Sequence, residues 1–172
     1  MKAKLINILE PSDGKIGDIV VFEMGGFHFV AELKDCSSRD FPFNKEIDID
    51  IKFYCHEIIG VYKSEEEFHN DVKSMNTESM IPVGSFPPND DDMDNFRPSP
   101  MNFINSVVDE IVNNNLLGAP DNFIFFEGKM MGLILDQCLY FDDLKKKQEI
   151  EVGDIVSGIY WAEVYLDEKV IN

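Results

Sequence analysis

The cleanest pattern in the chain is a strict alternation of apolar and polar residues over positions 46–56. The apolar set is Ile47, Ile49, Ile51, Phe53 and Cys55, and the polar set is Asp48, Asp50, Lys52, Tyr54 and His56. Because successive side chains of a strand point to opposite faces, the pattern predicts a strand with one buried and one exposed face. Residues 58–62 continue or close this strand. Such a strand needs a sheet around it, so we expect a mainly β fold.

The tetrapeptide Gly-Asp-Ile-Val occurs twice, at residues 17–20 and 153–156, and each copy leads into a long apolar and aromatic run. Gly and Asp suit turns, while Ile and Val suit a pleated surface, so each copy predicts a turn that begins a strand. The two copies are followed by different elements. We therefore interpret them as one local structure used twice, and not as an internal duplication.

Local signals predict a hairpin and a helix in the first half of the chain. Residues 16–33 contain two apolar runs joined at Gly25-Gly26, a dipeptide typical of tight turns. Residues 64–67, Ser-Glu-Glu-Glu, have the Ser-x-x-Glu form of a capping box, and apolar residues follow at helical spacing. These signals predict a helix over residues 65–75.

The stretch 81–100 has no apolar period and is rich in Pro and Asp. We expect a loop or linker there. It divides the chain into an N-terminal β subdomain of residues 1–80 and a C-terminal domain of residues 101–172. In the second part, residues 123–126, 133–135 and 152–166 predict strands, and residues 141–148 favour a short helix because acids precede lysines.

Residues 101–113 support two interpretations. Their apolar residues recur at a helical period, with Ser99 and Pro100 in suitable positions to begin a helix. Against a helix, most of these apolar residues are β-branched and Asn is scattered among them, and both features lower helix propensity. The local sequence alone leaves the choice between helix and strand open.

The second half resembles a group of bacterial proteins of uncharacterised function that have OB-like barrels. The resemblance covers residues 102–166 and depends on two motifs, residues 115–118 (Asn-Leu-Leu-Gly) and residues 153–161 (Gly-Asp-Ile-Val-Ser-Gly-Ile-Tyr-Trp). It implies an OB-like β-barrel in the C-terminal half, with residues 103–113 as a strand. It implies no activity, because a fold alone does not specify one.

The formal net charge of −18, from 33 acidic and 15 basic residues, limits the classes of partner. This charge disfavours nucleic acid and anionic membranes, and it favours a basic protein partner or simply solubility. No apolar run approaches the roughly 20 residues of a membrane-spanning helix. The apolar part of the N-terminus is too short for a signal peptide, so we expect a cytoplasmic protein.

No catalytic or metal-binding pattern stands out. The cysteines Cys36, Cys55 and Cys138 are odd in number and far apart, which argues against a disulfide framework. The acidic loop around Asp90, Asp92 and Asp94 lacks the Gly and the final Glu of a calcium loop, and the three histidines show no zinc spacing. We therefore expect no metal and no cofactor.

Two groups of residues remain as candidate binding residues. Tyr160, Trp161, Glu163 and Tyr165 cluster in the last predicted strand, and aromatic side chains beside an acid can form a protein-binding patch. Alternation separates Tyr160 from the other three. Glu127 and Asp136 are acids within apolar strands, with Lys129 as the counter-charge there. The simpler interpretation makes the aromatics core residues and the acids solvent-facing.

These observations favour a non-catalytic, acidic protein-interaction module that binds a basic partner. An immunity or inhibitor protein against a basic toxin has a suitable size and charge. The first alternative is an OB-like module that binds a small molecule or a carbohydrate. The lowest-ranked alternative is a hydrolase with an acid-based site. The sequence does not specify the oligomeric state.

Overall fold

The structure is a computed structural model that describes residues 2–10, 17–83, 85–86, 97–112, 123–130, 133–140 and 150–166. For residues 123–130 and 133–140 it describes the backbone. The predicted helix at 141–148, the loop at 115–118 and the acidic residues Asp90, Asp92 and Asp94 lie outside the described residues.

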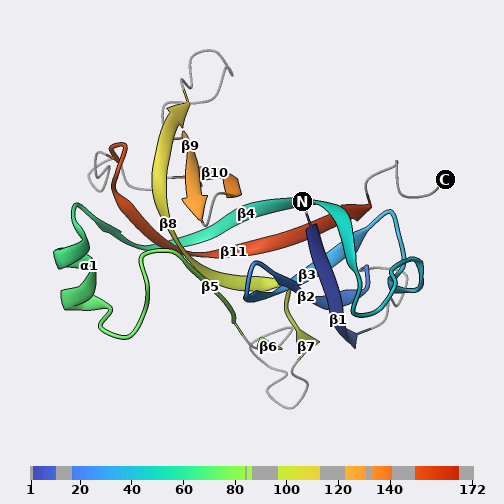
Figure 1. Ribbon diagram of the computed structural model, residues 1–172. Helices are drawn as coiled ribbons and strands as arrows, with labels where there is room; N and C mark the ends of the chain where they lie inside the picture. The colour runs from blue at the N-terminus through green and yellow to red at the C-terminus, as the bar shows by residue number, and fades with distance from the viewer. Residues whose placement is uncertain are drawn as a thin grey trace. The chain divides into compact units, whose positions relative to one another are not determined.

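The described residues form a mainly β structure with one α-helix (Figure 1). The strands are β1 (Lys2–Glu10), β2 (Ile19–Met24), β3 (Phe27–Lys34), β4 (Glu46–Tyr62), β5 (Ser79–Pro82), β6 (Ser85–Phe86), β7 (Arg97–Pro98), β8 (Met101–Val112), β9 (Phe123–Met130), β10 (Leu133–Tyr140) and β11 (Ile155–Leu166). The helices are α1 (Glu65–Asp71) and the short 3-10 helix η1 (Ser38–Asp40). The mainly β prediction is confirmed. No helix within the described ranges is long and apolar enough to cross a membrane.

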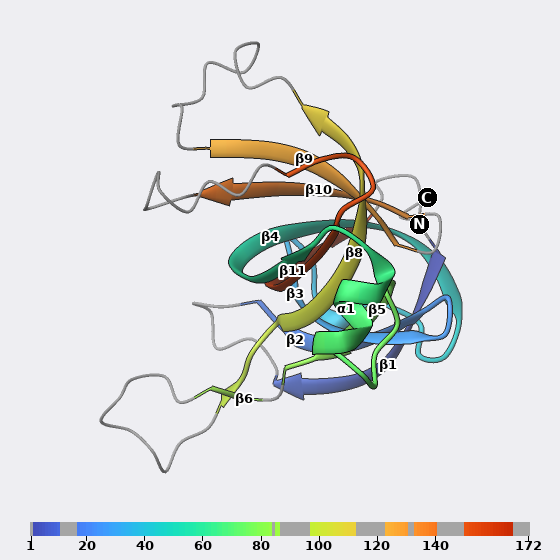
Figure 2. The same cartoon turned by 90° about the vertical axis from the view of Figure 1, so that its left-hand side faces the viewer.

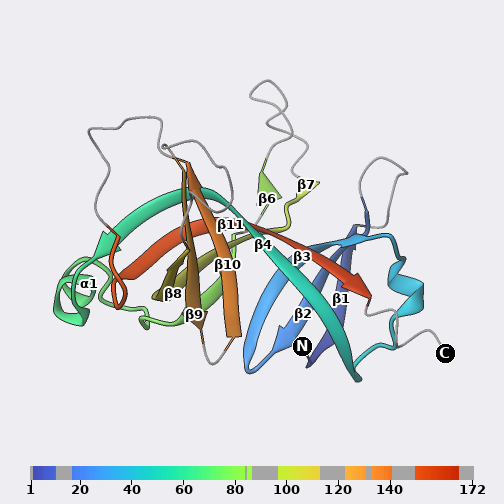
Figure 3. The same ribbon diagram turned by 90° about the horizontal axis from the view of Figure 1, so that it is seen from above.

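The chain forms two compact units, and each is assembled from separate stretches of sequence. Unit 1 contains residues 1–52, 80–102 and 161–172, and unit 2 contains residues 53–79 and 103–160. Strands β4, β8 and β11 each contribute residues to both units. Figure 3 shows β4 as one long continuous strand. Two of the divisions, after residues 79 and 102, lie near the ends of the predicted linker at 81–100, whereas those after residues 52 and 160 fall within β4 and β11. The predicted subdomain of residues 1–80 and domain of residues 101–172 stay a prediction.

In unit 1, β1 pairs antiparallel with β2 and with the start of β4. Strand β2 also pairs antiparallel with β3. On its other side, β3 pairs parallel with the end of β11. The hairpin between β2 and β3 turns at Gly25 and Gly26, with φ angles of 57° and 88°. Two successive positive φ angles are typical of the turn that matches strand twist. The predicted hairpin is thus confirmed. Strand β1 was not predicted from the sequence, which gave no structure for the N-terminus.

In unit 2, helix α1 covers one face of the sheet (Figure 2). Phe68 of α1 packs with Tyr62 and Ile155. Val156, which follows Ile155 on β11, packs on the opposite face of the strand with Val108 and Ile150. The N-terminal part of β11 is therefore buried on both faces. This arrangement explains why the adjacent residues Ile155 and Val156 are both apolar instead of alternating with polar ones.

Helix α1 begins where the sequence predicted and ends earlier. The Ser64 side chain accepts a hydrogen bond from the Glu67 N–H, while the Glu67 carboxylate accepts one from the Lys63 N–H instead of closing the capping box on Ser64. The helix ends at Asp71, and Val72 is its C-cap with φ −115° and ψ 73°. Val72 and Ser74 have lower helix propensity than Ala or Lys, and the helix stops short of residue 75.

Residues 101–112 form strand β8, which confirms the strand implied by the resemblance. Ile104 and Val108 are buried on one face, and Asn105 is buried on the other. The apolar residues of this segment therefore recur at a helical period because both faces of the strand contain buried residues. The buried Asn side chains are satisfied by hydrogen bonds: Asn102, for example, pairs with both the N–H and the C=O of Val30 at 2.8 Å.

Candidate functional site

The predicted alternation at the end of β11 is present in the structure. Tyr160 is fully buried in unit 2 at 0% exposure, whereas Trp161, Glu163 and Tyr165, in unit 1, are partly exposed. Burial raises the pKa of the Tyr160 hydroxyl well above its usual 10, with a smaller contribution from the neighbouring Cys55 thiol. The Tyr160 side chain is thus a core group, and it does not contribute to a surface formed by the other three residues.

Glu163 and Tyr165 already interact with side chains of their own chain. The Tyr165 hydroxyl donates a hydrogen bond of 2.8 Å to Glu163, and the Lys52 ammonium lies 4.7 Å from the centroid of the Tyr165 ring. The Lys34 ammonium lies 3.4 Å from Glu163 and 2.7 Å from Glu32. A partner would have to compete with these intramolecular contacts for both side chains.

Glu32 and Glu163 are the pair of carboxylates in unit 1 that comes closest to an acid-based hydrolytic site. They are register partners on parallel strands, and Lys34 lies between them. Burial lowers the pKa of Lys34, but the hydrogen bonds and charges of the two carboxylates outweigh this effect and raise it. A glycosidase-type pair needs one protonated and one ionised member. The Lys34 ammonium contacts both carboxylates, so this geometry gives the two the same partner and does not distinguish an acid from a base.

Unit 2 contains a buried polar cluster around Asn105. Its side chain accepts a hydrogen bond from Ser157 Oγ at 2.6 Å and donates to Ser79 Oγ at 2.9 Å and to the Asn76 carbonyl at 3.1 Å. Ser157 is 1% exposed, so its hydroxyl is inaccessible to a substrate in this structure. The cluster fixes how β8 and β11 pack within unit 2 and offers no exposed nucleophile.

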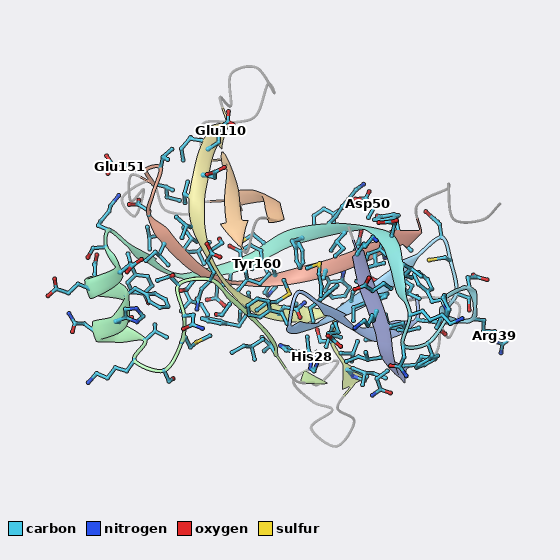
Figure 4. The ribbon with its side chains drawn as sticks, viewed as in Figure 1. His28, Arg39, Asp50, Glu110, Glu151 and Tyr160 are labelled. Carbon is cyan, nitrogen blue, oxygen red and sulfur yellow. The ribbon has the colours of Figure 1, made fainter. Side chains whose placement is uncertain are left out.

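The predicted site residues Glu127 and Asp136 are brought together by the pairing of β9 and β10. They are direct register partners, and Glu127 is also the register partner of Glu110 on β8. Glu110 is exposed and lies near the end of β8 (Figure 4). We call Glu110, Glu127 and Asp136 the acidic row: three carboxylate residues at consecutive register positions across three neighbouring strands.

A β-bulge at Asp109 sets the register of the acidic row. Val108 pairs with Gly128, and after a one-residue shift Glu110 pairs with Glu127. Without the bulge, Asp109 would be opposite Glu127. Sequence reasoning identified Glu127 and Asp136 but missed Glu110, because an adjacent pair of acids at a strand end does not reveal which of the two enters the register.

The acidic row places like charges at paired register positions. Directly opposed residues on neighbouring strands are separated by about 4.5–5.5 Å, and like charges at such positions destabilise a sheet. Three such positions follow one another in the row, so the repulsion expected of one pair is expected twice. Positive charge supplied from outside would relieve it, and this is the physical reason to regard the row as a binding site.

Metal and disulfide chemistry receives no support from the side chains that the structure describes. No group of three or more His, Cys, Asp or Glu side chains among them could hold a metal ion. No disulfide joins Cys36 to Cys55. Comparison with protein-family models, with curated proteins and with solved structures finds no match.

Proposed function

We propose that this protein is a non-catalytic, acidic interaction module that binds a basic protein, and that the acidic row is part of the binding surface. The observation that carries the proposal is the consecutive register of Glu110, Glu127 and Asp136. Lys or Arg side chains of a partner would replace repulsion within the row by attraction. Binding would then gain more from these carboxylates than from isolated surface acids.

The charge of the rest of the chain supports the same partner class. Unit 2, which contains the row, has 16 acidic and 6 basic residues, and unit 1 has 17 and 9. A field of one sign steers an oppositely charged protein and accelerates its association at low salt. An immunity or inhibitor protein against a basic toxin, with an OB-like C-terminal half, is the specific form of this proposal. A cytoplasmic setting, in which thiols stay reduced, is part of the same proposal.

The test is affinity capture from a lysate of the organism that encodes the chain, with quantitative mass spectrometry. Three baits are compared: the unaltered protein, the row variant E110Q/E127Q/D136N, and the control variant E57Q/E65Q/E66Q. The control removes the same number of charges from exposed positions in the same unit. We expect a basic protein at stoichiometric yield with the unaltered protein and the control, and a large loss with the row variant.

Two results would contradict the proposal. One is the absence of any stoichiometric protein partner at low ionic strength. The other is equal capture by the row variant and the control, which would mean that net charge matters and the register of the row does not.

A further inference from the structure

Strand β10 forms the end of the hydrogen-bonded strand order. It pairs with β9 over all eight of its residues, Leu133 to Tyr140, and it pairs with no other strand in the described part of the chain. Figure 2 shows β9 and β10 side by side. In a strand with one neighbour, alternate N–H and C=O groups face the open side, where another strand can pair with them.

The sequence of β10 has few of the features that keep edge strands from pairing. Natural edges are protected by Lys, Pro, bulges or very short length. The β10 sequence, Leu-Ile-Leu-Asp-Gln-Cys-Leu-Tyr, has no Lys and no Pro, and its pairing with β9 has no register shift. Asp136 is its single charged residue. The backbone of β10 is therefore regular and continuous enough to accept an added strand along its whole length.

We infer that β10 accepts an extended segment of the basic partner as an additional strand, with a Lys or Arg at the register position opposite Asp136. The inference rests on the proposed function and adds the mode of binding. The acidic row ends at β10, and an added strand would lie about 4.8 Å beyond it. The residue opposite Asp136 thus takes the next position in the row, where a positive charge is favourable and an acid would extend the repulsion.

Charge also distinguishes the possible occupants of the β10 edge. A second copy of this chain would bring a net charge of −18 and another acidic row to the edge. A basic segment of alternating polar and apolar residues instead matches both the charge of the row and the two-residue period of a strand. The occupant is therefore a strand from a basic protein.

The inference is tested with a synthetic peptide of eight residues that alternates Lys and Val, added to the full-length protein at low salt. Amide hydrogen exchange is followed by NMR or mass spectrometry. At saturating peptide, we expect exchange to slow by roughly tenfold or more at alternate β10 amides, since only the outward-facing ones gain a partner. The row variant E110Q/E127Q/D136N should bind this peptide roughly tenfold more weakly than the control E57Q/E65Q/E66Q.

The outcomes separate the two proposals. Binding that depends on the acidic row but leaves the β10 amides unprotected would overturn strand addition and keep the proposed function. Binding that the row variant does not weaken would overturn both. Protection of β10 in the protein alone, increasing with its concentration, would identify a second copy as the occupant and overturn the inference, as would equal protection by a peptide with Glu in place of Lys.

Discussion

The Oγ of Ser157 on β11 donates a hydrogen bond of 2.6 Å to the Oδ1 of Asn105 on β8, and both side chains are buried. The amide nitrogen of the same Asn bonds to Ser79 and to the backbone of Asn76. One side chain on β8 thus satisfies polar groups from two other stretches of unit 2, residues 76–79 and β11. A buried polar group without a partner is costly, so this Asn has a structural role that its apolar neighbours could not replace.

Replacing Asn105 with Ala should lower the free energy of unfolding by about 3 kcal/mol, since it removes the partner of two buried hydroxyls, those of Ser79 and Ser157. Ser157→Ala leaves the buried Oδ1 of Asn105 without this donor and should cost less, about 1–2 kcal/mol. Both values can be measured by urea denaturation. Asn70→Ala, at an exposed position on α1, is the control. If Asn105→Ala resembled that control, the buried cluster would not contribute to stability.

The two Gly-Asp-Ile-Val copies should respond differently to the same substitution. A Cβ on Gly17 would clash with the carbonyl oxygen of Leu33, whereas a Cβ on Gly153 would meet nothing within 4 Å. Gly153 instead has a φ of 94°, which is strained for other residues at a cost of about 1–3 kcal/mol. We expect Gly17→Ala to be the more destabilising in thermal unfolding. The reverse order would contradict the close approach at Gly17.

Alkaline pH should destabilise the fold through Tyr62. Burial, assisted by the hydrogen bond of 2.7 Å to Asp71, raises the pKa of the Tyr62 hydroxyl from 10 to about 12. A raised pKa in the folded state stabilises the fold fully below pH 10, and this contribution is lost as the pH rises through about 12. Urea denaturation between pH 9 and about 12 should show this loss. Tyr62→Phe should reduce its slope, and an unchanged slope would contradict the assignment.

Neutralising the acidic row should stabilise the free protein while it weakens binding. Glu127→Gln removes the central charge of the row, and we expect the free energy of unfolding to rise by about 0.2–1 kcal/mol. Glu57→Gln, at an exposed position outside the row, should change it by less than about 0.5 kcal/mol. Chemical denaturation at low salt measures both. A destabilised Glu127→Gln protein would show that the carboxylate has a stabilising partner in the fold.

Raising the salt concentration provides an internal check on the row. Salt screens repulsion between exposed charges, with a Debye length of about 10 Å at 0.1 M. The stability difference between the unaltered protein and Glu127→Gln should therefore shrink as salt is added. A difference that does not depend on salt would indicate a change in packing instead of charge repulsion.

Local sequence determined the secondary structure wherever one interaction dominates. Alternation over residues 46–56 indicated part of β4, the Gly25-Gly26 dipeptide placed the hairpin turn, and Ser64 marked the start of α1. These features depend on side-chain period, on backbone freedom and on capping, and each acts within a few residues. Residues 101–112 were ambiguous because a strand buried on both faces loses the two-residue period on which such a prediction depends.

Only the tertiary structure decided how the strands divide and which acids meet. The division of β4, β8 and β11 between two units depends on pairings between residues far apart in the chain. The sequence by itself determined that Glu127 and Asp136 lie in strands. Their meeting with Glu110 depends on strand register and on one bulge at Asp109. Register is fixed by cross-strand packing, and a shift of one residue would place a neighbour of Glu110 opposite Glu127.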